Sequence, residues 1–226
     1  PKILVANPEL EGKQEEFKQF DIDILKRLYN NLVLLDRPKN YFKSRHIEMQ
    51  SWSKFSLGYS DKQDMVTVPV HSPDGMPIGI VARSIEGKTF KNSTNLPKSK
   101  TMFNIHRAKK IGSNVIVVES SFDAIRVHQA GFPNVVATLG GSLSSEQQRL
   151  LNKYFSTIII MTDADEAGRE LGLSISNRLN TKDILWASYD YGKIYPHDAK
   201  DVGDMTDQEI QQCIKNSVSH IEYVSW

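Results

Sequence analysis

Apolar residues recur at helical spacing through the first part of the chain. Residues 13–35 carry them at mostly helical intervals, and the segment Asp36-Arg-Pro-Lys ends the run, which predicts one long amphipathic helix. Residues 41–47 predict a second, shorter helix. Residues 65–85 hold two β-rich runs around Pro73-Asp74-Gly75, which is a turn signal. This part of the chain is therefore expected to be mostly helical at first and then to form an antiparallel hairpin.

The pattern changes in the second half of the chain. Residues 86–100 are polar and predict a loop, and residues 101–110 predict a short helix. After these, strands are expected at 114–119, 135–137, 157–162 and 183–189, and helices at 122–130, from 144, at 166–179 and near 207–219. Repeated strand and helix units at this spacing indicate a parallel sheet with right-handed crossovers. The sequence predicts an α/β fold, with a parallel sheet flanked by helices in residues 113–226 and a smaller basic α+β subdomain in residues 1–112.

Charge is distributed unevenly between these two parts, although the formal net charge is only +1. Residues 1–112 carry 19 Lys and Arg against 12 Asp and Glu, whereas residues 113–226 carry 9 against 15. A basic part joined to an acidic part suits a protein that holds a polyanion with one and metal ions with the other.

Composition excludes several classes of protein. Cys213 is the only cysteine, so the chain has no internal disulfide and no multi-cysteine zinc site, and we expect no zinc in this chain. Cys213 itself is expected to be a packing residue of a helix. No apolar run approaches the roughly 20 residues of a membrane span, and the N-terminal residues lack the apolar core of a secretory signal. We therefore expect a cytoplasmic protein with no membrane partner.

Acidic residues follow two of the predicted strands. Glu119 closes the run 114–119, and Asp163 and Asp165 follow the run 157–162 on the same side of the extended chain. The carboxyl ends of parallel strands form a ligand-binding edge, where grouped carboxylates repel one another unless a cation joins them. Oxygen ligands suit Mg²⁺ or Mn²⁺, so these acids predict a metal site for phosphate chemistry. Taken singly, Asp165 could instead be a helix N-cap and Glu119 an exposed strand end.

Further acids could belong to the same edge. Asp123 lies four residues after Glu119 and either supports it or faces solvent. Asp198, Asp201 and Asp204 follow the fourth predicted strand, in a loop that would emerge at this edge of the sheet. The alternative for that loop is an ordinary solvated surface.

Residues 83–110 are strongly basic, with eight Lys or Arg and Glu86 as the single acid. Charge of one sign over a hairpin end and a loop suits contacts with triphosphate and template backbone, and a solvated face is the alternative. Aromatic residues in the first half could stack on bases, but their spacing favours core positions. These aromatic residues are Trp52, Tyr59, Phe90 and Phe103.

The acid-bearing segments resemble the Toprim domain of bacterial-type DNA primases. The matching segments are Val118-Glu119-Ser-Ser-Phe-Asp123, Gln129-Ala-Gly-Phe-Pro-Asn-Val-Val-Ala-Thr-Leu-Gly140 and Asp163-Ala-Asp165-Glu-Ala-Gly168-Arg169. Topoisomerases, some nucleases and recombination proteins share this acid pattern. The resemblance implies that Glu119, Asp163 and Asp165 are catalytic and bind divalent metal. It also matches Asp201 to an acid of the family's later metal-binding loop.

The first half resembles the RNA-polymerase core of the same primases, in the same order. The matching segments include Tyr41-Phe-Lys-Ser-Arg45-His-Ile, Ile78-Gly-Ile-Val-Ala-Arg83 and Phe90-Lys91-Asn92-Ser93, followed by Lys98. The resemblance implies that Arg45, Arg83 and Lys98 hold template and nucleotide phosphates. A further lysine of the family corresponds to either Lys88 or Lys91.

The predicted function is therefore that of a DNA primase core. It would synthesise short RNA primers on single-stranded DNA from ribonucleoside triphosphates, with two or more Mg²⁺ or Mn²⁺ ions. The resemblance also implies a replicative helicase and a zinc-binding domain outside this chain as partners, in a bacterial cell or a phage-infected host. The alternatives are a Toprim-type nuclease or topoisomerase-like strand cleaver, and an inactive nucleic-acid-binding module. The basic segment favours priming, and the intact acids argue against the inactive module.

Overall fold

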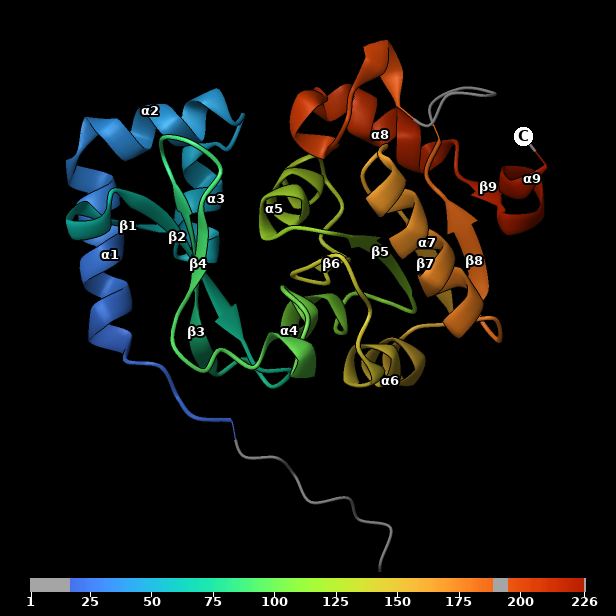
Figure 1. Ribbon diagram of the computed structural model, residues 1–226, viewed down its shortest axis with the longest axis horizontal. Coiled ribbons are helices and arrows are strands. Elements are labelled where there is room, and N and C mark those ends of the chain that lie inside the picture. The colour runs from blue at the N-terminus through green and yellow to red at the C-terminus, as the bar shows by residue number, and fades with distance from the viewer. Residues whose placement is uncertain (1–16, 189–194, 226) are drawn as a thin grey trace, which may run out of the picture.

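The computed structural model describes residues 17–188 and 195–225, and it contains two β-sheets that lie side by side (Figure 1). The chain enters through α1 (Ile22–Leu34), α2 (Asp36–Ser44) and α3 (Met49–Phe55). Asp21 begins α1, because its side chain accepts a hydrogen bond of 2.8 Å from the backbone N–H of Asp23. Leu35 then adopts an extended conformation and separates α1 from α2. Pro38 lies in the first turn of α2, where a helix tolerates proline.

The first sheet is antiparallel and joins its four strands in chain order. The strands are β1 (Gly58–Ser60), β2 (Met65–His71), β3 (Pro77–Ser84) and β4 (Phe90–Asn92). β2 and β3 form the predicted hairpin, and Gly75 lies between them with a φ of 96°, a conformation that favours glycine. The register shifts between Val70 and His71, next to the turn.

The second sheet has the strand order β6-β5-β7-β8-β9, with β9 antiparallel at one edge and the other strands parallel. Its strands are β5 (Asn114–Val118), β6 (Val135–Ala137), β7 (Thr157–Ile160), β8 (Asp183–Trp186) and β9 (Val218–Ser219). The helices of this half are α4 (Ile105–Ala108), α5 (Ser121–Gln129), α6 (Ser145–Tyr154), α7 (Glu166–Arg178), α8 (Asp207–Lys215) and α9 (His220–Val224). The predicted α/β fold, with a parallel sheet flanked by helices, is confirmed.

Consecutive residues of β5, an inner strand of this sheet, enter two different hydrophobic clusters. Ile116 and Val118 belong to the cluster that contains residues of α5 and α8, whereas Val115 and Val117 belong to the cluster that contains residues of α6 and α7. Side chains alternate along a strand, so a sheet covered on both faces needs apolar residues at every position. This explains why the run reads as unbroken β-branched residues rather than as an alternation.

The first of these clusters continues into the N-terminal helices. Phe42 of α2 stacks on Phe122 of α5, with ring centroids 6.1 Å apart, and Phe55 of α3 stacks on Phe103 at 5.6 Å. The apolar core therefore crosses residue 112 without a break. The division into domains 1–112 and 113–226 stays a prediction.

A buried arginine adds polar contacts to this junction. Arg126 of α5 is only 3% exposed and donates hydrogen bonds to the carbonyl oxygens of His46 (2.9 Å) and Met205 (2.7 Å). It also donates to the carboxylate of Asp207 at 2.6 Å, and the two side chains form an ion pair. One guanidinium thus joins the end of the α2 segment, α5 and the start of α8.

Several predicted element boundaries are wrong. Within the described residues, the helix predicted at 13–35 begins only at Ile22, because Asp21 caps it there. The predicted loop 86–100 contains the short strand β4 and a 3₁₀ turn at Lys98–Lys100. The strand predicted at 183–189 ends at Trp186, and residue 189 lies outside the described residues. The last predicted helix is replaced from residue 218 by β9 and α9.

The burial predictions hold for most of the residues concerned. Trp52, Tyr59 and Phe103 are at most 3% exposed, as predicted for core aromatics, and Cys213 is buried in α8. Phe90 is 53% exposed, so its prediction as a core residue is wrong, because β4 is an edge strand with an exposed face. No helix in the described ranges is long and apolar enough to cross a membrane.

Two histidines pack against each other between β2 and α4. The rings of His71 and His106 lie 4.6 Å apart, and burial lowers the pKa of His71 to about 4 and that of His106 to about 3. These pKa values include the charge of Arg107, which lowers both, and at His106 the charges of His71, Lys110 and Lys109 as well. Between pH 6.5 and about 4 the unfolded chain therefore binds protons that the folded chain does not, and stability falls as the pH falls.

The variant His106→Gln should consequently lose less stability on acidification than the wild type. From pH 7 to pH 4.5, the unfolding free energy of the wild type should fall by about 1 to 2 kcal/mol more than that of the variant. Urea unfolding at a series of pH values measures it, and the acids titrate in both proteins and cancel in the difference. Parallel pH profiles for the two proteins would contradict the prediction.

Candidate functional site

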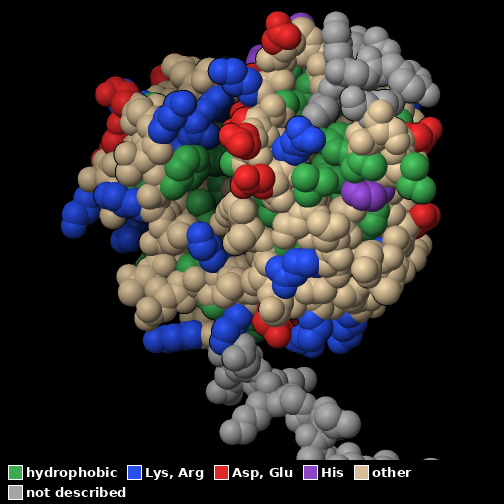
Figure 2. All heavy atoms as spheres, turned by 45° about the vertical axis from the view of Figure 1, so that its right-hand side comes forward, with side chains coloured by type: hydrophobic (Ala, Val, Ile, Leu, Met, Phe, Trp, Pro, Cys, Tyr) green, Lys and Arg blue, Asp and Glu red, His purple; other side chains and the backbone are tan. Residues whose placement is uncertain are grey.

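Three acid-bearing segments meet at the carboxyl edge of the parallel sheet. Glu119 directly follows β5, Asp163 and Asp165 lie between β7 and α7, and Asp201 lies beyond β8. The Asp163 segment and the Asp201 segment are joined by a backbone hydrogen bond of 2.7 Å from Ala164 N–H to the carbonyl of Lys200. Figure 2 shows acidic side chains near the middle of one face, with Lys and Arg side chains around them.

Glu119 contacts the strand end next to its own. Its Oε1 accepts a hydrogen bond of 3.1 Å from the backbone N–H of Asp163. Its carbonyl oxygen accepts one of 3.0 Å from the backbone N–H of Leu139, in the loop that follows β6. Leu139 has a φ of 62°, which is uncommon for a residue with a side chain, so the loop is held in a specific conformation. Glu119 is half-buried, which excludes the alternative of an exposed strand end.

Gly168 sets the distance between α7 and these acids. A Cβ at this position would lie 2.2 Å from the carbonyl oxygen of Asp163 and 2.7 Å from Oε1 of Glu119. The backbone N–H of Gly168 donates a hydrogen bond of 2.8 Å to Oδ1 of Asp165, which is the N-cap of α7. Asp165 is therefore a helix N-cap, which was the alternative to a metal ligand in the sequence analysis. It is also one of the acids at this edge of the sheet.

Asp163 and Asp165 occupy different environments. Both lie beyond the end of β7 at Ile160, so the strand alternation used to predict a shared side does not apply to them. Asp163 is half-buried, whereas Asp165 is exposed at the start of the helix. Their proximity results from the turn before α7 rather than from an extended strand.

Burial and mutual repulsion raise the pKa values of the inner acids Asp163 and Glu119. Burial, together with the charges of Asp123, Glu119, Asp201 and Asp165, raises the pKa of Asp163 to about 8. Burial also raises the pKa of Glu119, and the hydrogen bond from Asp163 N–H opposes this. A divalent cation at this edge would favour the charged forms of both carboxylates.

The other predicted acids divide into two groups. Asp123 is 7% exposed and forms a capping box with Ser120, and burial raises its pKa to about 6. It does not hydrogen-bond Glu119 in the described structure, but its charge acts on Asp163. Asp198 and Asp204 are exposed, and Asp204 accepts a hydrogen bond from Lys200 N–H. The geometry thus brings Asp123 and Asp201 toward the inner acids and leaves Asp198 and Asp204 at the surface.

The donor set of this edge fits a hard divalent cation. Glu119, Asp165 and Asp201 each use one carboxylate oxygen for a backbone N–H, and the second oxygen accepts no hydrogen bond from the described residues. Such oxygens are the ligands that Mg²⁺ and Mn²⁺ prefer. Among the described residues, however, no three acidic, histidine or cysteine side chains are already gathered as a metal site. Binding an ion would therefore require rotation of these side chains.

Arg83 packs against the start of the helix that follows Glu119. Its guanidinium lies between two rings, 5.1 Å from the centroid of Phe90 and 5.6 Å from that of Phe122, in the first turn of α5. Its Nε is buried and has no hydrogen-bond partner among the described residues. Arg45 lies over Tyr41, 5.9 Å from the ring centroid, at the end of α2. An unpaired donor on a fixed guanidinium is suited to an anionic ligand.

The three predicted lysines, Lys88, Lys91 and Lys98, are exposed and lie in the segment that follows Arg83. Lys88 precedes β4 and Lys91 lies within it, and both are exposed, so the structure does not choose between them. Lys98 begins the turn at Lys98–Lys100, and its Nζ would lie 3.6 Å from a Cβ at Gly140. Lys98 therefore reaches the loop after β6, which contacts Glu119 through Leu139.

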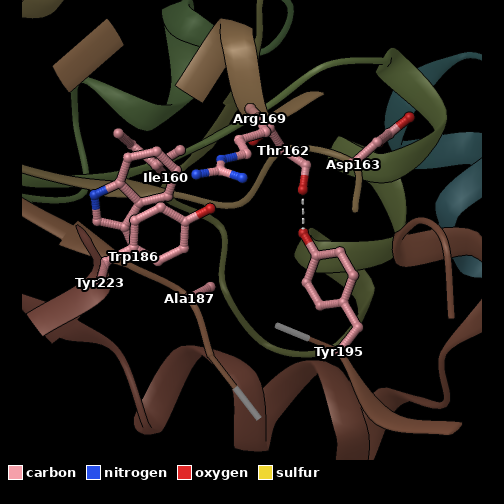
Figure 3. A pocket seen from close by; sticks show the side chains of 8 residues that line it. All are labelled: Ile160, Thr162, Asp163, Arg169, Trp186, Ala187, Tyr195 and Tyr223. Carbon is pink, nitrogen blue, oxygen red and sulfur yellow. Dashed lines mark hydrogen bonds between the residues drawn. The ribbon is translucent and has the colours of Figure 1, made fainter. Parts of the chain in front are cut away.

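A small pocket behind Asp163 involves residues that the sequence did not indicate (Figure 3). Tyr195 is buried, and its hydroxyl donates to the carbonyl oxygen of Thr162, next to Asp163. Trp186 stacks on Tyr223 with centroids 3.8 Å apart, and Arg169 points into the same pocket. Asp163 points away from these rings. These residues support the strand end from within, and no periodicity in the sequence could have identified the contacts between them.

Replacing Gly168 should disturb the acids through geometry alone. We expect Gly168→Ala to weaken Mn²⁺ binding by about 10-fold or more, because the new Cβ must displace the Asp163 carbonyl or the Glu119 carboxylate. Isothermal titration calorimetry measures the affinity. The matched control is Gly141→Ala, since a Cβ at Gly141 meets nothing within 4 Å. Equal affinities in the two variants would refute the prediction.

Comparison with known proteins assigns part of the second half of the chain to a family. Residues 113–185 match the Toprim domain. A DNA primase of Clostridium acetobutylicum is 27% identical over 93% of this chain and 42% of its own length. A DNA primase of Helicobacter pylori is 31% identical over 71% of this chain and 30% of its own length. The chain thus spans less than half the length of these curated relatives.

Solved structures show the same architecture. The Aquifex aeolicus primase, comprising zinc-binding and RNA polymerase domains, superposes with a TM-score of 0.76 at 23% identity, over 90% of this chain and 61% of its own. The catalytic domain of the primase DnaG bound to single-stranded DNA gives a TM-score of 0.73 at 15% identity, over 90% of this chain and 79% of its own. Residues 113–185 therefore form a Toprim domain, and the chain is a relative of the bacterial DNA primases with the fold of their catalytic core.

Proposed function

We propose that this chain is the catalytic core of a DNA primase, which synthesises short RNA primers on a single-stranded DNA template from ribonucleoside triphosphates. The observation that carries the proposal is that Arg83 and Lys98 lie against the segments that follow β5 and β6 at the acidic edge of the Toprim sheet. Arg83 is clamped on Phe122 at the start of α5, and Lys98 lies beside the loop that contacts Glu119. Nucleotide joining needs both a metal site and a site for the triphosphate.

The inner acids have distinct proposed roles. Asp163, Asp165 and Asp201 hold divalent metal, and Glu119 is either a further ligand or the group that accepts the proton of the attacking hydroxyl. Two or more Mg²⁺ or Mn²⁺ ions, when bound, supply the charge that activates the 3′ hydroxyl and stabilises the departing pyrophosphate. The backbone hydrogen bonds to Glu119, Asp165 and Asp201 orient one oxygen of each and leave the other for the ion.

The basic residues act on phosphates. Arg83 and Arg45 are forked donors that suit phosphate oxygens, and the Nε of Arg83 lacks any other described partner. Lys98, with Lys88 or Lys91, supplies mobile positive charge along the exposed side. Neutralising triphosphate charge beside the carboxylates also reduces the repulsion between the substrate and the acids.

The partners follow from the same proposal. A structural neighbour with this fold binds single-stranded DNA, and we propose the same ligand here as template. A replicative helicase and a zinc-binding domain are proposed as partners outside this chain, which spans 42% of the Clostridium relative. The proposed setting is the cytoplasm of a bacterial cell or of a phage-infected host.

The variant Asp163→Asn should abolish primer synthesis while keeping the fold. We expect the rate to fall by more than about 100-fold, since even the outer partners of a metal site are commonly worth about 10- to 100-fold. The assay uses labelled ribonucleotides, Mg²⁺ or Mn²⁺ and single-stranded DNA, and circular dichroism checks the fold. Asp183→Asn is the matched control, because Asp183 is an exposed acid at the opposite end of β8.

The other outcomes of this assay would each indicate a different function for the chain. Full primer synthesis by Asp163→Asn would remove the acids from the mechanism. Nicked or cleaved DNA without oligoribonucleotides would indicate a Toprim strand cleaver. An inactive wild type that also fails to bind Mn²⁺ in calorimetry would indicate a nucleic-acid-binding module without a metal site.

A further inference from the structure

One buried glutamine connects the basic segment to the acidic edge. Gln147 of α6 is 2% exposed, and the two N–H groups of its Nε2 lie within hydrogen-bond distance of three carbonyl oxygens, so that one N–H is shared between two of them. These belong to Lys98 (3.1 Å), Thr101 (3.0 Å) and Thr138 (2.7 Å). Its Oε1 accepts a hydrogen bond of 3.0 Å from Ser144 N–H. Every polar atom of this side chain is therefore used in joining separate parts of the chain.

The three carbonyls lie on two segments with proposed functions. Lys98, the lysine proposed to bind phosphate, begins the turn Lys98–Lys100, and Thr101 directly follows this turn. Thr138 lies between β6 and Leu139, and its backbone N–H donates to the carbonyl of Val118, directly before Glu119. Gln147 thus ties the position of Lys98 to the strand end that carries Glu119.

The first turn of α6 makes a further contact with the same segment. The hydroxyl of Ser144 donates a hydrogen bond of 2.5 Å to the carbonyl of Ser99, and its oxygen accepts the backbone N–H of Gln147 at 3.0 Å. Three carbonyls in the stretch from Lys98 to Thr101 are consequently held by Ser144 and Gln147. The side chain of Lys98 extends from this stretch and is exposed.

The choice of an amide at position 147 has a specific physical reason. Gln147 is the third helical residue of a capping box, a position that glutamate or glutamine can fill. In the other capping boxes of the described chain the corresponding residue is an acid, namely Asp123, Glu209 or Glu222. A carboxylate at 147 would complete the cap equally well, but it would direct a negative oxygen at three carbonyl oxygens. The N–H donors, rather than the cap, therefore require glutamine.

We propose that Gln147 is a positioning residue, which holds the Lys98 segment against the loop after β6 and so sets the affinity of the site for a nucleoside triphosphate. This inference rests on the proposed function. It goes beyond it by assigning substrate affinity to a residue that does not reach the substrate. The hydrogen bonds of the Gln147 side chain to Lys98, Thr101 and Thr138 form a clamp. Loss of this clamp should free the Lys98 segment while leaving the carboxylates and their contacts in place.

Two variants at Gln147 separate the clamp from the helix cap. Gln147→Glu keeps the cap and loses the donors, and Gln147→Met loses both. In each we expect the KM for ribonucleoside triphosphates to rise about 10-fold, a scale reached by small misplacements of binding groups, with kcat within about 3-fold of the wild type. Gln148→Met is the matched control, because among the described residues the Gln148 side chain hydrogen-bonds only Arg178 on the neighbouring helix. Its KM should remain that of the wild type.

A double variant tests whether the effect passes through Lys98. Lys98→Ala combined with Gln147→Met should raise the KM no more than Lys98→Ala alone, because the clamp has then nothing left to position. Additive effects, or a KM change in Gln148→Met as large as that in Gln147→Met, would overturn the inference.

Hydrogen exchange and nucleotide binding separate this inference from the proposed function. In Gln147→Met, amides of residues 98–101 should exchange faster than in Gln148→Met, and the Kd for Mg²⁺-ATP in equilibrium dialysis should rise about 10-fold. Both measurements work with a wild type that makes no primers, in which case the proposed function fails and the clamp can still stand. Unchanged exchange and an unchanged Kd in Gln147→Met would reject the clamp.

Discussion

The buried guanidinium of Arg126 is the interaction on which the rest of the arrangement depends. It lies on α5, which begins right after Glu119, and it donates to the carbonyl of His46, next to Arg45, and to that of Met205, close after the Asp201 segment. A buried charge needs such partners, and Asp207 adds an ion pair, while the buried Nε of Arg126 has no hydrogen-bond partner among the described residues. The helix after Glu119, the segment next to Arg45 and the loop after Asp201 are therefore all held by the side chain of Arg126. Apolar packing between Phe42 and Phe122 would bring the halves together, but it would not fix their orientation as hydrogen bonds do.

At the edge that Arg126 organises, the sheet keeps acids together against their own repulsion. Burial and neighbouring charges raise the pKa of Asp163 to about 8, a cost that folding bears without a cation. Two features confine the acids despite this cost. Gly168 allows α7 to approach within a distance that no side chain permits, and the backbone N–H groups of Asp163 and Gly168 hold Glu119 and Asp165. A site that is destabilised when empty has a larger relative gain on binding metal, provided that the fold has other sources of stability.

The sequence predicted those parts of the molecule that depend on neighbouring residues. Unbroken β-branched runs identified β5 and β7, because a sheet covered on both faces buries consecutive residues. Local patterns also located Glu119, Asp163 and Asp165, since acids after such runs must emerge at the carboxyl edge. The same reasoning gave the wrong cause for the proximity of Asp163 and Asp165, because β7 ends at Ile160 and the turn before α7 decides their directions. It also missed β9, a short edge strand that pairs with β8 only through contacts distant in sequence.

What the sequence could not supply are side chains whose role is set by distant backbone. Tyr195 reaches the carbonyl of Thr162, and Gln147 reaches those of Lys98 and Thr138, over separations that no periodic pattern encodes. Gln147 nevertheless leaves a trace, since a capping box that carries an amide where the others of the described chain carry an acid implies that donors are needed there. A buried amide satisfied by three backbone carbonyls tolerates neither a carboxylate nor a hydrocarbon without loss. The distinction between glutamine and glutamate at one cap position therefore carries information about tertiary structure, and it points to the Lys98 segment, whose placement we propose to matter for nucleotide binding.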